Sequence, residues 1–404
     1  MMNKLGIYIH IPFCVKKCDY CDFLSAPADE KTMERYAKAL MKEIEYSKEK
    51  MTEYLVDTVF IGGGTPSILE GKWIARVLQV LNANCNIAED AEITIECNPG
   101  TVTEEKLLLY KRAGINRLSL GLQSAKDEEL KSIGRIHSYA EFLESYHMAR
   151  RCGFDNINID LMSALPEQSE QSYKETLERI IELNPEHISA YSLIVEEETE
   201  MYRRVESARA KGDDILPSEE EERGMYYMTK DLLAGAGYKR YEISNYAKPG
   251  YECRHNIGYW KRKDYLGFGI GAASLYQEER YNNVTDIHLY MDKLLKTDDS
   301  YINRADNISD KVSGNDIVDS IEENRQKLLV EEQMEEFMFL GLRMMKGVST
   351  KAFEEKFEKR YEEVYGKVSD KLVEQGLLEQ NGDCIKLTER GIDISNYVMS
   401  EFLF

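Results

Sequence analysis

Short apolar runs alternate with longer amphipathic segments through the first half of the chain. The runs are rich in β-branched residues and have the length of β-strands. They cover Leu5–Ile11, Asp57–Ile61, Glu92–Glu96, Arg117–Leu122, Asn156–Leu161 and His187–Val195. The segments between them have helical periodicity and cover Lys31–Lys50, Lys72–Leu81, Glu104–Ala113, Asp127–Ser132, Tyr139–Cys152, Ser172–Leu183 and Glu219–Ala236. This alternation predicts parallel strands joined by right-handed crossovers.

The number of strand–helix units and the turn after the first strand decide between two parallel-sheet architectures. A doubly wound dinucleotide-binding sheet would carry G-x-G-x-x-G after its first strand, and this chain does not. Six units without that turn favour a (β/α) barrel that is not complete. We therefore predict an α/β fold with a partial (β/α)6 barrel over residues 1–240.

The pattern changes beyond Lys239. Gly267–Ser274 is rich in glycine but lacks the strand–helix context and the acidic residue of a dinucleotide site, so no such site is predicted. We assign residues 241–296 to an extension of the barrel. Scattered Asn, Asp and Ser residues predict a polar linker or insertion over residues 297–330.

Residues 331–404 predict a separate helical domain. Its later part contains a β-hairpin with a turn at Asn381-Gly382, and Thr388 is placed to cap a last helix. Helices followed by a small hairpin resemble a winged-helix unit. The domain has 16 acidic and 10 basic residues, which disfavours binding to DNA and favours a packing or lid role.

Chemically unusual residues follow five consecutive predicted strands. They are a cysteine loop, the glycines of Gly62–Thr65, Glu96, Gln123 and Asp160. The C-terminal ends of barrel strands converge on one face, where the loops that carry active sites lie. We therefore predict that the functional site lies on this rim.

The loop after the first strand holds Cys14, Cys18 and Cys21, spaced C-x3-C-x2-C. Thiolates bind zinc and iron–sulfur clusters. A closed zinc site would need a fourth ligand such as His10, and a disulfide would leave one thiol over. The third alternative is a [4Fe–4S] cluster with one iron open to a small ligand.

This cysteine spacing, with Tyr20 just before the last cysteine, resembles the signature of radical S-adenosylmethionine (SAM) proteins. The resemblance implies that Cys14, Cys18 and Cys21 hold a [4Fe–4S] cluster. It also implies that the amino and carboxylate groups of SAM occupy the open iron. Gly62–Thr65 is similar to the glycine motif that contacts the SAM amino group in that family.

Further residues match the oxygen-independent coproporphyrinogen oxidase group of these proteins, in which two SAM molecules can bind. A carboxylate accepts hydrogen bonds from ribose hydroxyls, and an Arg fork suits a carboxylate. The resemblance implies that the SAM-binding residues are Tyr8, Tyr20, Gly63, Gly64, Thr65, Glu96, Gln123, Arg135 and Asp160. Of these, Tyr8, Gly63 and Glu96 match contacts of the first SAM.

Two features indicate which subgroup of the oxygen-independent coproporphyrinogen oxidase group the chain resembles. Phe23 stands where the coproporphyrinogen dehydrogenases carry a further cysteine, and their longer N-terminal extension is absent. The sequence His255-Asn256-Ile-Gly-Tyr259-Trp260 is similar to the HNxxYW motif of the HemW-like haem chaperones. The resemblance implies a haem site at His255, Asn256, Tyr259 and Trp260, since imidazole is a common axial ligand of haem iron. The alternative is a buried His–aromatic cluster that closes the open side of the barrel.

The resemblance covers nearly the whole chain and implies a haem chaperone that delivers haem to apo-haemoproteins. Respiratory haem proteins are the expected recipients, which would bring the protein to the membrane surface, and a homodimer is compatible with this hypothesis. The alternative is an enzyme, a coproporphyrinogen III dehydrogenase that decarboxylates its substrate through a 5′-deoxyadenosyl radical. Phe23 argues against that alternative.

The composition indicates which partners and which cellular compartment to expect. The net charge is −21, from 73 acidic and 52 basic residues, which disfavours a nucleic-acid partner. Hydrophobic residues make up 43% of the chain without a run long enough to span a membrane. The first predicted strand begins too early for a signal peptide, and cysteines are few, so a reducing cytoplasm is expected.

Overall fold

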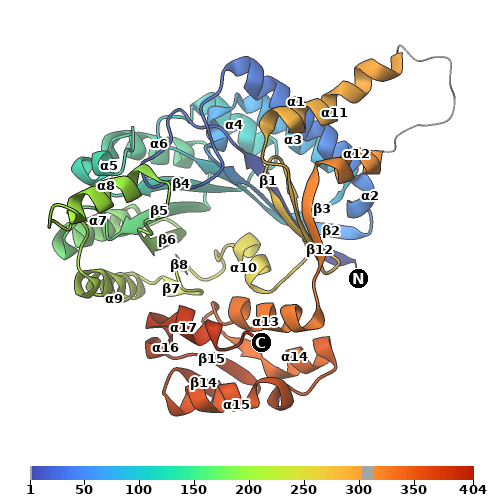
Figure 1. Cartoon of the computed structure of the whole chain (residues 1–404). Helices are drawn as coiled ribbons and strands as arrows, with labels where there is room; N and C mark the ends of the chain where they lie inside the picture. Colours follow the sequence, from blue (N-terminus) through green and yellow to red (C-terminus); the bar gives the residue numbers. More distant parts are fainter. Residues whose placement is uncertain (1, 303–313) are drawn as a thin grey trace.

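The computed structural model describes residues 2–302 and 314–404. Within these ranges twelve strands form one curved sheet, and its centre is six parallel strands in sequence order (Figure 1). They are β1 (Asn3–Ile11), β2 (Tyr54–Gly63), β3 (Asn86–Cys97), β4 (Arg117–Gln123), β5 (Ile157–Ser163) and β6 (His187–Ser192). β6 pairs with β8 and not with β1, so the barrel is open. The predicted α/β fold with a partial barrel is confirmed.

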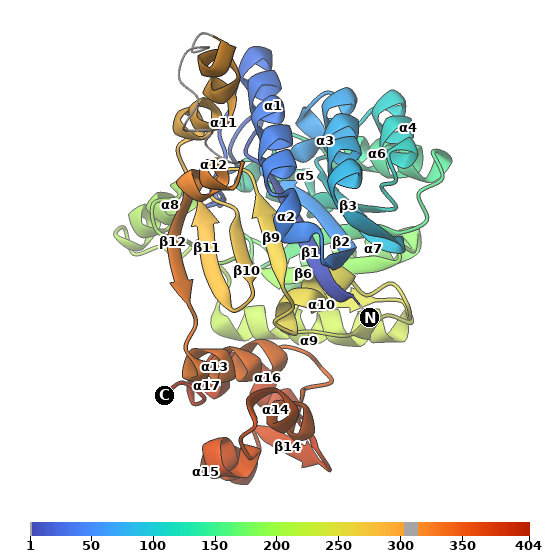
Figure 2. The ribbon, with the colours of Figure 1, turned by 90° about the vertical axis from the view of Figure 1, so that its right-hand side faces the viewer.

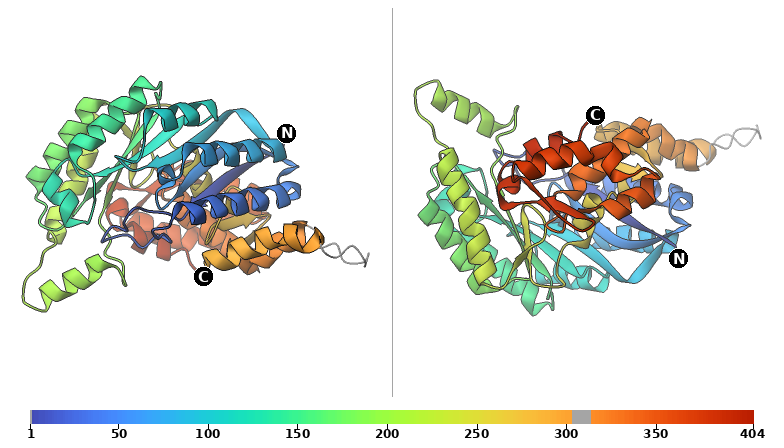
Figure 3. Two further views of the ribbon diagram at one scale, coloured as in Figure 1. Left: turned by 90° about the horizontal axis from the view of Figure 1, so that it is seen from above. Right: turned by 90° about the horizontal axis from the view of Figure 1, so that it is seen from below.

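Helices cover the outer face of this sheet, and Figure 3 shows them from above. They are α1 (Glu30–Tyr46), α2 (Lys48–Met51), α3 (Gly71–Asn84), α4 (Glu104–Arg112), α5 (Asp127–Ser132), α6 (Tyr139–Arg151), α7 (Glu170–Leu183) and α9 (Glu219–Gly235), with a 3-10 turn η1 (Pro66–Ile68). α8 (Glu200–Arg209) projects away from this layer, and its Met201 N–H donates to the Asp19 carbonyl of the cysteine loop. Ser138 and Ser218 begin α6 and α9 with complete capping boxes. Polar α8 was not predicted, because it buries only Met201 and Val205.

The extension lengthens both edges of the sheet. β7 (Lys239–Arg240) and β8 (Asn245–Ala247) continue from β6, and α10 (Arg254–Trp260) follows them. β9 (Tyr265–Phe268) runs parallel to β1, and β10 (Ala273–Tyr276) and β11 (Glu279–Asn283) are antiparallel to their neighbours. Figure 2 shows β9, β10, β11 and β12 beside β1. The glycine-rich stretch therefore joins two strands of the sheet.

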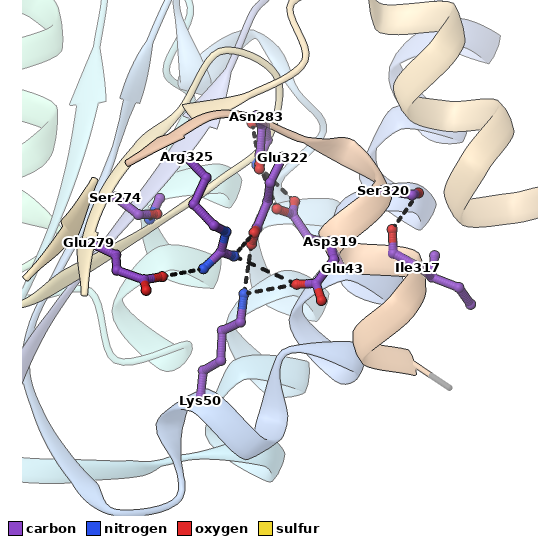
Figure 4. A network of polar contacts seen from close by, with 12 residues as sticks. Glu43, Lys50, Ser274, Glu279, Asn283, Ile317, Asp319, Ser320, Glu322 and Arg325 are labelled. Carbon is purple, nitrogen blue, oxygen red and sulfur yellow. Dashed lines mark hydrogen bonds and ion pairs between the residues drawn. The ribbon is translucent and has the colours of Figure 1, made fainter. Parts of the chain in front are cut away.

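The described part of the predicted linker, residues 297–330, is regular structure. It contains the end of α11 (Ile287–Ile302), then α12 (Gly314–Ile321) and β12 (Glu322–Lys327), while residues 303–313 lie outside the described residues. β12 is polar because it is the exposed edge strand. Lys50 reaches Glu322 and Asp319, and Arg325 reaches Glu279, so ion pairs hold this strand to the barrel (Figure 4).

The C-terminal domain has helices around a small antiparallel sheet of its own, as predicted. The elements are α13 (Val330–Gly341), β13 (Val348–Ser349), α14 (Thr350–Phe357), α15 (Tyr361–Glu374), β14 (Leu378–Asn381), β15 (Cys384–Leu387), α16 (Glu389–Asp393) and α17 (Ser395–Ser400). β14 and β15 form the hairpin, and the Thr388 side chain caps α16. A separate apolar core around Phe353 and Leu372 holds the domain together.

Buried charges join this domain to the barrel. Glu336 of α13 accepts from Arg262 Nε at 2.5 Å and from Arg280 at 2.6 Å, and both Arg262 and Glu336 are buried. The Arg343 guanidinium lies over the Trp260 ring, 4.4 Å from its centroid. The two units therefore meet through specific polar and cation–π contacts.

Candidate functional site

The cysteine loop lies on the predicted rim, between β1 and α1. Backbone hydrogen bonds from Cys14 to Ala26 and from Ala26 to Pro12 close the loop at its base. Cys14 is buried, Cys18 and Cys21 are partly exposed, and none of the three forms a disulfide. The loop thus presents three reduced thiols from one short segment.

Polar groups from other elements surround the thiols. Thr65 Oγ1 lies 3.6 Å from Cys14 Sγ, and Arg135 donates to Cys18 Sγ at 3.6 Å. Burial raises the pKa of the Cys21 thiol, and the nearby Cys18 and Cys14 raise it further. Among the described residues, no group of three His, Cys, Asp or Glu side chains converges on one metal ion. Thiolates that each bind a different iron of a cluster do not need to converge in that way, so the donor set fits a cluster.

The glycine motif after β2 lies against this loop. Gly63 has a φ of +118°, and its N–H donates to Glu96 Oε2 at 3.1 Å. A Cβ at position 64 would lie 2.7 Å from the Phe13 carbonyl oxygen and 2.9 Å from Cys14 Sγ. Gly64 is therefore required by the close approach of the cysteine loop.

Two carboxyl groups face the interior of the barrel. Burial, together with the charge of Asp160, raises the pKa of Glu96 to about 8. Burial also raises the pKa of Asp160, although Asn158 donates to it at 2.7 Å. Such groups are poised to accept hydrogen bonds from a cationic or hydroxyl-bearing ligand.

We expect Glu96→Gln to flatten the pH dependence of stability. The unfolded carboxyl ionises near pH 4.5 and the folded one near pH 8, so wild-type stability falls as the pH rises between these values. The variant should become more stable than the wild type by roughly 2 kcal/mol or more at the upper end of this range. Urea denaturation at a series of pH values measures this. Exposed Glu105→Gln is the control, and parallel profiles for Glu96→Gln and wild type would contradict the prediction.

Three more of the predicted SAM-binding residues form hydrogen bonds or apolar contacts with neighbouring side chains. Gln123, in a left-handed conformation with φ of 75°, accepts from the Tyr191 hydroxyl at 3.1 Å. Arg135 donates to Asn98 at 2.9 Å as well as to Cys18. Tyr20 packs beside an apolar cluster that includes Met162. These contacts bring the cysteine loop, β4 and β6 together around one site.

A cavity of about 290 Å³ lies inside the barrel next to these residues. Predicted residues in its lining are Tyr8, Gly63, Glu96, Asp160 and Asn256, and Phe23 lies at its edge. Sequence reasoning missed Arg117, Ser119, Asn158 and Ser189, which also line it. The sequence pattern that could have predicted them is a polar residue at alternate positions of an otherwise apolar strand, because alternate residues face the same side of a sheet.

Arg117 is the most unusual of the missed residues. Its side chain is only 2% exposed, and its Nε has no hydrogen-bond partner in the described part of the chain. Burial lowers the pKa of the Arg117 guanidinium, but the nearby Cys253, Glu92 and Asp160 raise it, and the net shift is upward. A buried cation therefore balances the carboxyl groups of the cavity.

The residues of the HNxxYW motif lie on α10, beneath this cavity. His255 is 3% exposed, its Nδ1 lies 3.0 Å from Thr58 Oγ1, and its Nε2 lies 2.9 Å from the Tyr259 hydroxyl. Burial lowers the pKa of His255 to about 3. Asn256 faces the cavity, and Trp260 faces the C-terminal domain. Both ring nitrogens of His255 are thus occupied, and binding iron would require the loss of one hydrogen bond.

Comparison with known proteins agrees with this geometry. The radical SAM superfamily model matches residues 8–180, and the HemN C-terminal domain model matches residues 328–394. The structure of coproporphyrinogen III oxidase (HemN) from Escherichia coli superposes with a TM-score of 0.81 at 22% identity, over 99% of this chain and 90% of that one. The fold and the cysteine loop define a radical SAM protein.

Similar curated proteins show which family of radical SAM proteins the chain belongs to. "Heme chaperone HemW" of Bacillus subtilis is 35% identical over 98% of both chains. Its namesake from Lactococcus lactis is 34% identical over 98% of this chain and 96% of that one. That from Escherichia coli is 42% identical over 67% of this chain and 70% of its own. The chain belongs to the HemW heme chaperone family.

No helix in the described ranges is long and apolar enough to cross a bilayer.

Proposed function

We propose that the protein binds haem and transfers it to apo-haemoproteins. The observation that carries this proposal is the similarity to the HemW heme chaperones along essentially the whole chain. Phe23 supports it, because its side chain is 63% exposed at the edge of the cavity, in the position where the dehydrogenases carry a further cysteine. An exposed phenylalanine offers no ligand to a metal or a substrate carboxylate.

The same proposal includes a [4Fe–4S] cluster held by Cys14, Cys18 and Cys21. When bound, the cluster would offer one open iron to the amino and carboxylate groups of SAM. Gly63 and Glu96 are placed beside the loop to receive the polar part of SAM, and Arg135 fixes the loop through Cys18. The remaining proposed contacts are Tyr8, Tyr20, Gly64, Thr65, Gln123 and Asp160.

We infer that the recipients are respiratory haem proteins, so the protein would act in the cytoplasm and contact the membrane surface at delivery. A homodimer would be compatible with this role. The acidic net charge of −21 supports a protein recipient over a nucleic acid.

The test uses protein reconstituted with iron and sulfide and loaded with one equivalent of haem without oxygen. The expected result is transfer to a respiratory enzyme stripped of its haem b, faster than the passive release measured by capture with apomyoglobin. Equal rates would contradict delivery. In parallel, incubation with coproporphyrinogen III and SAM should leave the substrate unchanged, and conversion to protoporphyrinogen would overturn the proposal in favour of the dehydrogenase.

A further inference from the structure

The cavity inside the barrel contains a buried cation that has no bonding partner. Arg117 is the first residue of β4, lines the cavity and is only 2% exposed. Its guanidinium forms no hydrogen bond or ion pair with another residue in the part of the chain that the structure describes. A guanidinium carries five N–H donors, and burying them without acceptors costs free energy. The fold therefore keeps a strong hydrogen-bond donor without an acceptor at this place.

Two acidic side chains lie near Arg117, and other groups bind both of them. Glu92 accepts from the backbone N–H groups of the first two residues of α10, each at 3.0 Å. Asp160 accepts from Asn158 at 2.7 Å and from Ser119 at 3.3 Å. The two carboxyl groups lower the cost of burying the cation, but neither accepts a hydrogen bond from it. The donors of Arg117 are thus available to an anionic ligand.

Arg117 lies at the end of β4 that is remote from the cysteine loop. Near the other end of the strand, Arg135 donates to the Gly121 carbonyl and, at 3.6 Å, to Cys18 Sγ. A strand rises about 3.3 Å per residue, so Arg117, four residues before Gly121, lies roughly 13 Å deeper in the barrel. A ligand of Arg117 is therefore distinct from a ligand of the cluster.

The proposed SAM contacts also lie nearer the cysteine loop. The strand register pairs Glu96 with Ser119 and Asp160 with Gly121, which are two and four residues beyond Arg117. Under the proposed function, the carboxylate of SAM lies on the open iron. Arg117 is left for the carboxylate of a different ligand.

The cavity shares its walls with the helix that carries the HNxxYW motif. Asn256 of this motif lines the cavity together with Arg117. Phe60 of β2 also lines it, and the Phe60 ring stacks on the His255 ring with a centroid distance of 5.3 Å. A ligand held by the motif therefore lies beside the space that Arg117 faces.

The side chains next to Arg117 make this part of the cavity polar. Asn158 donates to Ser119 Oγ at 2.8 Å, and Ser189 donates to Asn158 Oδ1 at 3.1 Å. All three line the cavity. A porphyrin such as haem has one edge with two propionates and another edge with apolar vinyl groups. The polar wall and the guanidinium suit the propionate edge.

We propose that Arg117 binds a propionate carboxylate of haem and thereby sets the orientation of the porphyrin at the motif of α10. The inference rests on the proposed haem-chaperone function and names a specificity-determining residue of the same haem site. The planar fork of a guanidinium forms two parallel hydrogen bonds to a carboxylate. The cavity, of about 290 Å³, is smaller than a porphyrin, so the propionate enters it and the ring stays outside.

The test compares haem with haem dimethyl ester, in which both propionates are blocked, by titration followed through Soret absorbance. We expect the wild type to bind haem at least about tenfold more tightly than the diester. Arg117→Met should bind both compounds with the affinity that the wild type has for the diester. Exposed Arg112→Met on α4 is the control and should keep the wild-type preference.

Equal affinities of the wild type for haem and for the diester would overturn the inference, as would a full preference for haem in Arg117→Met. A wild-type protein that binds neither compound would instead refute the proposed function.

Two further variants separate binding of the propionate from a structural role. Arg117→Gln keeps a polar side chain without the charge and should lose the preference for haem over the diester, even if Arg117→Met does not fold. Arg117→Lys keeps the charge without the fork and should retain part of the preference. A wild-type preference in Arg117→Gln would overturn the inference.

SAM is the other source of a carboxylate, and a separate measurement distinguishes it from haem. Equilibrium dialysis of SAM against the reconstituted proteins should give the same affinity for Arg117→Met and the wild type. A loss of SAM affinity in Arg117→Met, with its preference for haem over the diester unchanged, would assign the guanidinium to SAM and overturn the inference.

Discussion

A Cys18→Ala variant is expected to lose its iron and sulfide completely after anaerobic reconstitution. Three thiols from one short loop are the proposed ligands, and a cluster left with two protein ligands is not retained. Burial already raises the pKa of the Cys21 thiol, so this ligand favours its protonated form when the cluster is absent. The wild type should take up iron and sulfide and acquire the broad visible absorbance of a cluster.

The matched control is Cys152→Ala, since Cys152 is a partly exposed free cysteine at the end of α6, outside the cysteine loop. It should load as fully as the wild type. Iron and acid-labile sulfide per chain, together with visible absorbance, measure the outcome. Full loading of Cys18→Ala would exclude Cys18 as a ligand.

Glu336→Ala is expected to lower the free energy of unfolding by about 3–5 kcal/mol, because it removes one side of a buried ion pair. Glu336 receives both Arg262 and Arg280, and Arg262 also pairs with Glu278 at 2.6 Å. Without Glu336, two guanidinium groups at the junction of the domains lose their common partner.

Urea denaturation and thermal unfolding compare this variant with Glu331→Ala on the same helix. Exposed Glu331 lies 3.8 Å from Lys359, and such surface pairs contribute at most about 1 kcal/mol. Equal losses in the free energy of unfolding for the two variants would contradict a stabilising role for the ion pairs at the domain junction. Earlier proteolytic release of the C-terminal domain in Glu336→Ala would locate the damage at the junction.

The central architecture could be predicted because parallel strands buried on both faces are continuous apolar runs. All seven residues of β4 are buried, for example, and the run Arg117–Leu122 was clear in the sequence. β12 could not be predicted, because five of its six residues are exposed and it is held by ion pairs with distant partners such as Lys50. Tertiary context made this polar segment a strand.

Residues at or near the C-terminal ends of the strands were found, but four polar residues inside the barrel, Arg117, Ser119, Asn158 and Ser189, were missed. Arg117 begins a predicted strand and was given no role, because nothing in the sequence showed that the fold buries it. Asn256 was assigned to haem by its motif, and the structure lines the inner cavity with it. The hydrogen bonds of the His255 ring to Thr58 and Tyr259 could not be judged from spacing, because Thr58 comes from a distant strand.

The pairing of β1 with β9 has a consequence for synthesis on the ribosome. β1 can meet β2 once about sixty residues have emerged, but its other edge pairs with Tyr265–Phe268. An unpaired edge strand is a template for association with other chains. The nascent chain therefore carries an open edge through most of translation. Ile270 and the start of α11, which line a cavity with Phe13 and Leu24 of the cysteine loop, are synthesised equally late.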